Sequence, residues 1–282
     1  MSLTLNLITD IKSVVAEWKK QGLKIGFVPT MGALHSGHES LIKKARESCD
    51  KVVVSIFVNP VQFGVNEDFD KYPRTLDADV EICEKNGVDV IFAPSAVEMY
   101  PEKNFTEIIP PDDYRNKLCG KSRVGHFNGV ALVVVKLFNI TQADVAFFGQ
   151  KDAQQLIIIK KFVRDLNIPT EIVACPIIRD ADGLALSSRN AYLGAEQRKK
   201  ALCLNKILKK VVEMYKNGEK SVEKVKKEAL KFLEDGALLE YFEFVSCLDL
   251  ELKKNLDDET LVAIAAKIGN IRLIDNVVLG NE

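Results

Sequence analysis

The sequence has few of the residues and runs that mark several common classes of protein. It contains only three histidines and six scattered cysteines, with no C-x-x-C pair (Cys49, Cys83, Cys119, Cys175, Cys203 and Cys247). This spacing argues against a zinc site and against a disulfide framework. No apolar run approaches the length of a membrane span, and the first ten residues lack a signal-peptide pattern. We therefore expect reduced thiols, a cytoplasmic location and no membrane partner.

A charge excess of either sign is also absent. The chain has 39 basic and 40 acidic residues, a formal net charge of -1, whereas nucleic-acid binders usually carry a basic excess. We expect no nucleic-acid partner. Hydrophobic residues make up 47% of the 282 residues and charged residues 28%, which is typical of a globular protein with a sizeable core. The length allows one large α/β domain and a smaller one.

Short apolar segments alternate with helical patterns over the first two-thirds of the chain. We predict strands at 24–29, 52–58, 88–93, 143–148 and 170–175, and helices at 39–48, 75–86, 128–139 and 152–166. Nearly all-apolar strands separated by helices indicate an α/β fold with a Rossmann-like parallel sheet covered on both faces. Such sheets bind ligands at the carboxyl ends of their strands.

The pattern changes after Asn190. Two Lys/Glu-rich helices are predicted at 194–217 and 221–234, and three strands without intervening helices at 239–245, 261–268 and 271–278. This order indicates an α+β domain with an antiparallel sheet. We expect a Rossmann-like domain over residues 1–185 and a smaller α+β domain over residues 186–282.

Two of the three histidines lie in the segment His35-Ser36-Gly37-His38, between a predicted strand and a predicted helix. Ser36 and Glu39 match an S-x-x-E capping box, which predicts a helix that begins at Gly37. The amides and the dipole of a helix N-terminus attract anions. Each histidine could instead only pack or cap. The H-x-G-H pattern at a strand-to-helix turn favours a nucleotide site.

Polar residues follow two further predicted strands. Asn59 and Gln62 come after the second strand, where amides could bind a ligand hydroxyl or carboxylate, although Asn-Pro is also a common turn signal. Lys151 follows the strand at 143–148, where a cation could stabilise charge on a transferring phosphoryl group or could simply be solvated. Asp152 could cap the next helix.

A dense set of donors lies near the expected domain boundary, in Ser187, Ser188 and Arg189. Two hydroxyls and a guanidinium after the glycine at 183 could bind phosphate oxygens. The segment could also be a plain polar linker between domains. Its position at the junction favours a mobile loop that closes over a nucleotide.

Together these segments closely resemble the pantoate–β-alanine ligase (pantothenate synthetase) family, which carries the HIGH-like motif of a nucleotidyl-transferase superfamily. The resemblance rests on PTMGALHSGH (29–38), SIFVNPVQFG (55–64), EDFDKYPRT (67–75), GHFNGV (125–130), FFGQKDAQQ (147–155) and DGLALSSRN (182–190). It implies a homodimeric cytoplasmic ligase that uses ATP and Mg²⁺. Such an enzyme joins pantoate to β-alanine through a pantoyl-adenylate and releases AMP and pyrophosphate for pantothenate synthesis.

The resemblance also implies the site residues. The ATP site would comprise Met31, Gly32, Ala33, Leu34, His35, Ser36, Gly37, His38, Gly149, Gln150, Lys151, Asp152, Ile178, Leu186, Ser187, Ser188 and Arg189. Within it, His38, His35 and Lys151 would be catalytic, and the smaller domain would close over the nucleotide. Pantoate and β-alanine would be held by Gln62, Gln155, Asn59, Arg123 and His126. No protein ligand of the metal is implied, because ATP phosphates would hold most of the Mg²⁺.

Two rival interpretations remain open. One is another HIGH-motif nucleotidyltransferase, which would need no amine acceptor. The other is an inactive nucleotide-binding regulator, although His38 and Lys151 are both present. The chain also departs from the family pattern at Gln150, where members usually have glutamate. That difference alters a local charge contact and leaves Lys151 in place.

Overall fold

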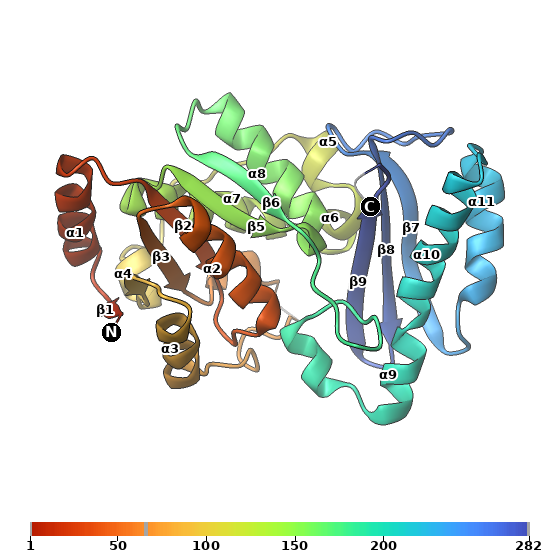
Figure 1. Ribbon diagram of the computed structural model, residues 1–282, viewed down its shortest axis with the longest axis horizontal. Helices are drawn as coiled ribbons and strands as arrows, with labels where there is room; N and C mark the ends of the chain where they lie inside the picture. The colour runs from red at the N-terminus through yellow and green to blue at the C-terminus, as the bar shows by residue number, and fades with distance from the viewer. Residues whose placement is uncertain (1, 65–66, 281–282) are drawn as a thin grey trace. The chain divides into compact units, whose positions relative to one another are not determined.

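The computed structural model describes residues 2–64 and 67–280, which form two compact units (Figure 1). The first unit comprises Met1–Pro111, Arg123–Gly149 and Ile158–Pro176, and the second comprises Asp112–Ser122, Gln150–Ile157 and Ile177–Glu282. The expected domain boundary at residues 185 and 186 stays a prediction, because compactness alone does not define a domain. Within the described residues, no helix has both the length and the apolar content needed to cross a bilayer.

The first unit is built on a six-stranded parallel sheet in the order β1-β4-β3-β2-β5-β6. Its strands are β1 (Leu3–Leu5), β2 (Ile25–Thr30), β3 (Lys51–Ile56), β4 (Val90–Phe92), β5 (Val145–Gly149) and β6 (Glu171–Cys175). β2, β3, β4 and β5 are buried along most of their length, which explains why their sequences are apolar rather than alternating. The predicted Rossmann-like fold class is confirmed.

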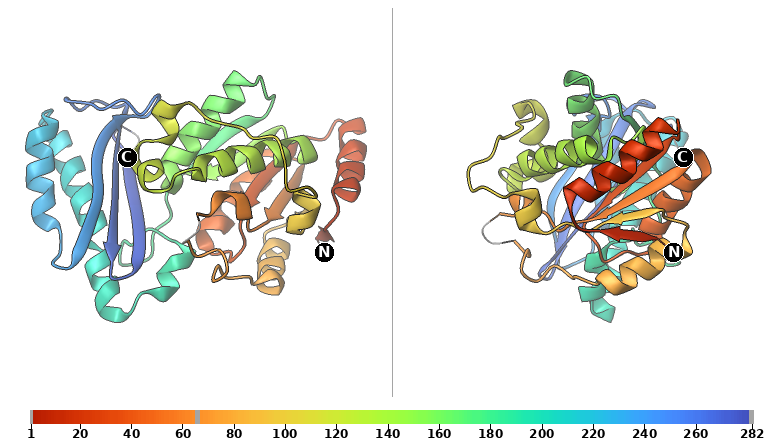
Figure 2. Two further views of the ribbon diagram at one scale, coloured as in Figure 1. Left: turned by 180° about the vertical axis from the view of Figure 1, so that it is seen from behind. Right: turned by 90° about the vertical axis from the view of Figure 1, so that its left-hand side faces the viewer.

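Helices cover both faces of this sheet, as Figure 2 shows. Its helices are α1 (Ile8–Lys20), α2 (Ser36–Ser48), α3 (Leu76–Lys85), α4 (Ala96–Met99) and α7 (His126–Thr141), and α8 (Ala153–Asp165) follows β5. Because parallel crossovers are right-handed, α2 and α3 lie on one face, and α1, whose crossover runs the opposite way, lies on the other with α7. β1, α1 and α4 were not predicted from the sequence.

The strand order reverses between β2 and β5, so the carboxyl ends of these two strands form the topological switch point of the sheet. β2 pairs with β5 only at Gly26 and Phe27. Pro29 lies beyond that pairing, where its missing N–H leaves no gap in a ladder with β5. The chain leaves β2 at Met31 and leaves β5 at Gln150, so both predicted phosphate-binding segments start at the switch point.

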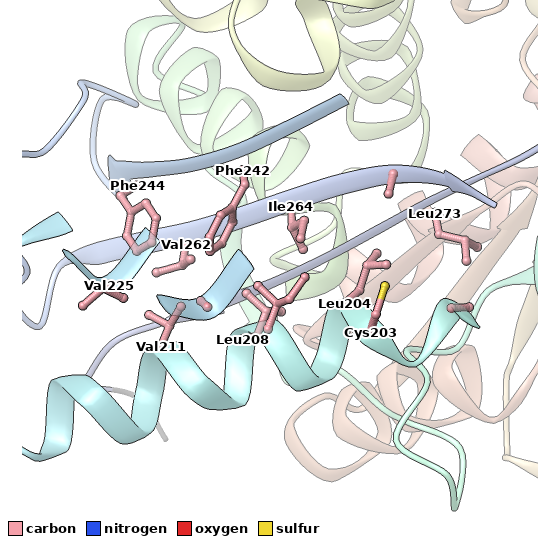
Figure 3. Close-up of a cluster of buried hydrophobic side chains, with 14 of the residues drawn as sticks. Cys203, Leu204, Leu208, Val211, Val225, Phe242, Phe244, Val262, Ile264 and Leu273 are labelled. Atoms are coloured by element: carbon pink, nitrogen blue, oxygen red, sulfur yellow. The ribbon is translucent and has the colours of Figure 1, made fainter. Parts of the chain in front are cut away.

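The second unit contains an antiparallel sheet in the order β7-β8-β9, covered by helices. Its elements are α5 (Asp112–Arg115), α6 (Leu118–Ser122), α9 (Ala195–Ala201), α10 (Cys203–Lys216), α11 (Val222–Ala229), β7 (Ala237–Ser246), β8 (Thr260–Ile268) and β9 (Ile271–Val278). One face of α10 carries Cys203, Leu204, Leu208 and Val211, which pack against sheet residues that include Phe242 (Figure 3). The predicted α+β class of this part is confirmed.

The helices of this unit are shorter than predicted. The single helix expected at 194–217 is divided at Leu202 into α9 and α10. Ala201 and Cys203 are both fully buried, although two positions two residues apart face away from each other on a straight helix. The break lets both enter one core. The helix expected at 221–234 ends at Ala229 and continues as a 3₁₀ turn, η4 (Leu230–Phe232).

The turn between β2 and α2 is held by a buried carboxylate. Gly32 and Ala33 have positive φ angles of 80° and 50°, a strained conformation for alanine. Asp79 on α3, only 1% exposed, accepts from Ala33 N at 3.0 Å and from Leu34 N at 2.8 Å. Gly32 N donates to the Thr30 hydroxyl at 3.2 Å. The turn therefore finds its acceptors inside the protein.

The predicted capping box at Ser36 and Glu39 is wrong, because α2 begins one residue earlier and His35 is its N-cap. Gly37 N donates to His35 Nδ1 at 3.1 Å, and His35 N donates to His38 Nδ1 at 3.2 Å. The two imidazoles thus form the reciprocal pair that serine and glutamate usually supply.

Replacing Asp79 with asparagine should destabilise the fold by about 1–3 kcal/mol. An amide presents one acceptor oxygen instead of two, which leaves a buried backbone N–H of the turn opposite a donor. Urea unfolding followed by circular dichroism would measure the loss.

Asp77→Asn is the matched control, since it removes the same charge from the same helix at an exposed position. It should change stability by no more than about 0.5 kcal/mol. Equal losses in the two variants would contradict the role given to Asp79.

Candidate active site

His35 and His38 lie together at the start of α2, with ring centroids 4.2 Å apart. In each ring Nδ1 accepts a backbone N–H, so the neutral ring carries its proton on Nε2. The pair therefore presents Nε2–H donors with their tautomer fixed by the backbone. Gly37 N already donates to His35 Nδ1, so this amide of the helix N-terminus has an acceptor within the protein.

The side chain of Gln62 is held by its neighbours in the first unit. Gln62 ends the 3₁₀ turn η1 (Pro60–Gln62) and is 8% exposed. Asn59 Nδ2 donates to Gln62 Oε1 at 3.1 Å, and Gln62 Nε2 lies 3.0 Å from Met31 Sδ. Tyr100 donates to Asn59 Oδ1 at 2.9 Å, and burial raises the pKa of Tyr100 and keeps this hydroxyl protonated. Three predicted site residues, Met31, Asn59 and Gln62, are thus in contact.

His126, the first residue of α7, and Arg123, which precedes that helix, support the same turn. Arg123 NH1 lies 3.0 Å from His126 Nε2, and a guanidinium can only donate. His126 Nδ1 therefore carries the proton and donates to the Gln62 carbonyl at 2.8 Å. Arg123 also binds Glu67 through Nε at 2.7 Å and through NH2. These contacts make both predicted residues supports of Gln62 in this structure.

Gly129 lets α7 approach η1 more closely than any other residue could. A Cβ at this position would lie 2.5 Å from the Val61 carbonyl oxygen and 2.6 Å from Gln62 N and Cα. Those atoms are backbone, so no side-chain rotation could relieve the clash. The approach allows Asn59 Nδ2 to donate to the Gly129 carbonyl at 3.1 Å. The position of Gln62 relative to α7 is therefore fixed by main-chain contact.

Lys151 lies in the second unit, in the 3₁₀ turn η2 (Gln150–Asp152) that precedes α8. Its Nζ is 3.9 Å from Asp152 Oδ2, and its side chain is 22% exposed. Gln154, in the first turn of α8, is 5% exposed and forms three hydrogen bonds with the backbone of α5, of α6 and of Lys117 between them. Of the two adjacent glutamines, Gln154 is thus structural, whereas the half-buried Gln155 is the predicted pantoate ligand.

A short hairpin at 178–186 leads to the serine and arginine segment in the second unit. Leu186 N donates to the Ile178 carbonyl at 3.0 Å, so these two predicted ATP-site residues are paired. Asn205 Nδ2 donates to the Gly183 carbonyl at 2.6 Å and packs against the hairpin tip. Ser187 then caps η3 (Ser188–Tyr192) by accepting from Arg189 N at 3.3 Å.

The predicted site residues thus fall into two sets. The first unit holds residues 31–37 with His35 among them, and also His38, Asn59, Gln62, Arg123, His126 and Gly149. The second unit holds Gln150, Lys151, Asp152, Gln155, Ile178, Leu186, Ser187, Ser188 and Arg189. Across residues 2–64 and 67–280, no group of three His, Cys, Asp or Glu side chains is placed to hold a metal ion.

Sequence reasoning missed two supporting residues of the first unit: Asp79, which binds the turn before α2, and Tyr100, which binds Asn59. Asp79 left a signal, because it lies four residues before the buried Cys83 on the core-facing side of α3. A carboxylate at such a position must have a partner. Tyr100 left none, because its partner Asn59 lies 41 residues earlier in the chain.

Arg123→Met should cost about 1–2 kcal/mol of stability at pH 7, and less in acid. Burial by itself raises the pKa of Glu67, but the hydrogen bonds and charge of Arg123 outweigh it and hold that pKa below its ordinary value of 4.5. The pairing therefore stabilises the fold above pH 4.5, and this contribution is lost as the pH falls through the folded-state pKa. Urea unfolding at about pH 7, 4.5 and 3.5 would measure the trend.

Lys199→Met is the control, because Lys199 and its partner Glu196 are 73% and 80% exposed. Its effect should stay below about 0.5 kcal/mol at every pH. A pH-independent loss in Arg123→Met would show that the Glu67 ion pair is not its cause.

Comparisons with known proteins match one family along almost the whole chain. A model of the family described as pantoate-beta-alanine ligase matches residues 4–278. The pantothenate synthetase of Clostridium novyi (strain NT) is 51% identical over 278 residues, which is 98% of each chain. That of Clostridium acetobutylicum is 52% identical over 274 residues, covering 96% of this chain and 97% of the relative.

Solved structures agree. The chain is similar to pantothenate synthetase from Thermus thermophilus, with a TM-score of 0.92 at 38% identity over 98% of this chain and 99% of that one. It is also similar to pantoate-beta-alanine ligase from Francisella tularensis complexed with beta-gamma ATP and beta-alanine, with a TM-score of 0.79 at 38% identity over 100% and 99% of the two chains. With a family match from residue 4 to residue 278 and relatives at half identity over nearly its full length, the chain belongs to the pantoate–β-alanine ligase family.

Proposed function

We propose that this ligase condenses (R)-pantoate with β-alanine and uses ATP to form pantothenate, AMP and pyrophosphate. The match to the family over residues 4–278 is the observation that carries the proposal. The related Francisella enzyme, whose structure contains an ATP analogue and β-alanine, supports the choice of nucleotide and amine. The reaction belongs to pantothenate biosynthesis.

The chemistry requires two steps because a carboxylate is a poor electrophile. In the first step, a carboxylate oxygen of pantoate attacks the α-phosphorus of ATP, and the bond from that phosphorus to pyrophosphate breaks. In the second step, the amine of β-alanine attacks the pantoyl carbonyl, the bond to AMP breaks, and the amine loses a proton. Catalysis of the first step consists mainly of positioning and of stabilising charge on phosphate oxygens.

The first step assigns roles to the ATP-site residues. His35 and His38 would donate from Nε2 to phosphate oxygens, because both Nδ1 atoms accept from the backbone. His38 would also supply a proton as the pyrophosphate leaves. Lys151 would neutralise charge on the α- and β-phosphates. Ser187, Ser188 and Arg189 would bind the β- and γ-phosphates, which leave together as pyrophosphate.

The acid and the amine would be held by amide side chains. Gln62 and Gln155 would bind the hydroxyls and carboxylate of pantoate, and Gln62 would also lie near β-alanine. Asn59, Arg123 and His126 would contribute here, the first and last through their contacts with Gln62. A ligand oxygen that replaced Met31 Sδ as the partner of Gln62 Nε2 would exchange a weak acceptor for a strong one.

Magnesium would enter with the nucleotide, as MgATP. Phosphate oxygens and water would hold most of the ion. We further propose that the enzyme is a cytoplasmic homodimer.

Measuring AMP release with ATP, Mg²⁺, pantoate and β-alanine, each omitted in turn, tests the proposal directly. All four should be required for sustained AMP release, and pantothenate should accumulate in equal amount. A nucleotidyl product that retains AMP would favour another HIGH-motif transferase, and the absence of turnover would favour a nucleotide-binding regulator.

Lys151→Ala should lower the rate of pantoyl-adenylate formation by roughly 100- to 1,000-fold, while the fold survives. The reason is the loss of a cation beside the charge that develops on the phosphates. Single-turnover quench experiments with labelled ATP would measure the rate. Lys160→Ala, an exposed lysine on α8, is the control and should be as active as the wild type.

Gln155→Ala should chiefly weaken pantoate binding, by about tenfold or more, because hydrogen bonds to a charged ligand are lost. The KM for pantoate reports this, with the KM for ATP measured in parallel. Gln21→Ala, at the exposed end of α1, serves as the control. An unchanged KM for pantoate would remove Gln155 from the pantoate site.

A further inference from the structure

Two adjacent polar residues in β9 are almost fully buried, and the proposed reaction assigns a role to neither. Asp275 and Asn276 are each 3% exposed. Burying a carboxylate and an amide costs free energy unless each is hydrogen-bonded. Successive residues of a strand point to opposite faces, so the two side chains reach different neighbours.

Asn276 binds the turn that carries Lys151. Its Nδ2 donates to the carbonyl of Gln150 at 3.0 Å and to that of Lys151 at 2.8 Å. Its Oδ1 accepts from Gln150 Nε2 at 3.3 Å. One amide side chain thus fixes the backbone carbonyl groups on both sides of the Lys151 Cα atom. A glutamate at position 150 could not make the last of these hydrogen bonds, because its side chain has no N–H to donate.

Asp275 binds the hairpin that leads to Ser187. It accepts from Arg179 NH1 at 2.6 Å and from Arg179 NH2 at 2.9 Å, a bidentate geometry that fixes direction as well as distance. Arg179 NH1 also donates to the Gly183 carbonyl at 3.3 Å, and Arg179 bridges to Ala185 across the hairpin. The hairpin is therefore tied to the opposite face of β9 from η2.

We propose that Asp275 and Asn276 form a two-sided clamp that sets the position of Lys151 relative to Ser187–Arg189. All of these residues belong to the second unit. The proposed reaction gives the clamp no contact with ATP, pantoate or β-alanine, so its members are positioning residues, and the proposal rests on the proposed function. Lys151 and the 187–189 segment would act on one triphosphate. An error in their spacing would therefore reduce stabilisation of the transition state more than binding of ATP in the ground state.

The first test is Asn276→Asp, which keeps the shape of the side chain but replaces the donor with a carboxylate facing two carbonyls. The rate of pantoyl-adenylate formation should fall roughly 10- to 100-fold, while the KM for ATP changes by less than about threefold. Asn255→Asp adds the same charge at an exposed position and should leave both unchanged. A wild-type rate in Asn276→Asp would overturn the proposal.

A double-mutant cycle separates positioning from general damage. If Asn276 acts through Lys151, then Asn276→Asp placed in a Lys151→Ala background should lower the remaining rate by less than about threefold. Losses that multiply would show that Asn276 acts independently of Lys151 and would overturn the proposal. If Asn276→Asp does not fold, Asn276→Ser, which is smaller and uncharged, is measured in the same cycle.

Hydrogen exchange tests the clamp whether or not the enzyme makes pantothenate. Asn276→Asp should speed amide exchange at 150–153 and leave 178–186 unchanged, whereas Asp275→Asn should do the reverse. Selective exchange in an enzyme without AMP release would overturn the proposed function and keep the clamp. Uniform or unchanged exchange beside normal catalysis by the wild type would overturn the clamp alone.

Discussion

The turn after β2 depends on one buried carboxylate. The backbone there adopts positive φ angles at Gly32 and Ala33, and the N–H groups that follow donate outside the sheet. Asp79 supplies their acceptors from α3, the helix that precedes β4. These two hydrogen bonds fix the backbone immediately before His35, and so they position the His35–His38 pair in the first turn of α2.

Buried polar side chains also hold other segments that carry predicted site residues. Asn59, Asp275 and Asn276 are all nearly fully buried, and each binds main-chain or side-chain groups of a neighbouring segment. Buried polar side chains hold direction better than apolar contacts, because a misaligned hydrogen bond in a low-dielectric interior is costly. The apolar clusters supply stability, and these polar residues supply orientation.

The sequence was enough to predict the parallel sheet, the antiparallel sheet and the family, because apolar periodicity and contiguous motifs are local signals. It was not enough at the start of α2, where Ser36 and Glu39 matched a capping pattern but His35 and His38 form it. Nor could it reveal Asn276, whose partners Gln150 and Lys151 lie more than a hundred residues earlier. Contacts made through tertiary structure leave no periodic trace. The assignments of individual site residues stay predictions.

The contact at Gly129 determines how mutations elsewhere in α7 would affect the position of Gln62. Main-chain atoms of α7 and of the Val61–Gln62 turn touch without an intervening side chain, so no rotamer can absorb a change in their spacing. A packing change at the far end of α7 would reach Gln62 as a rigid displacement. Substitutions that displace α7 should therefore also displace Gln62, a predicted pantoate ligand.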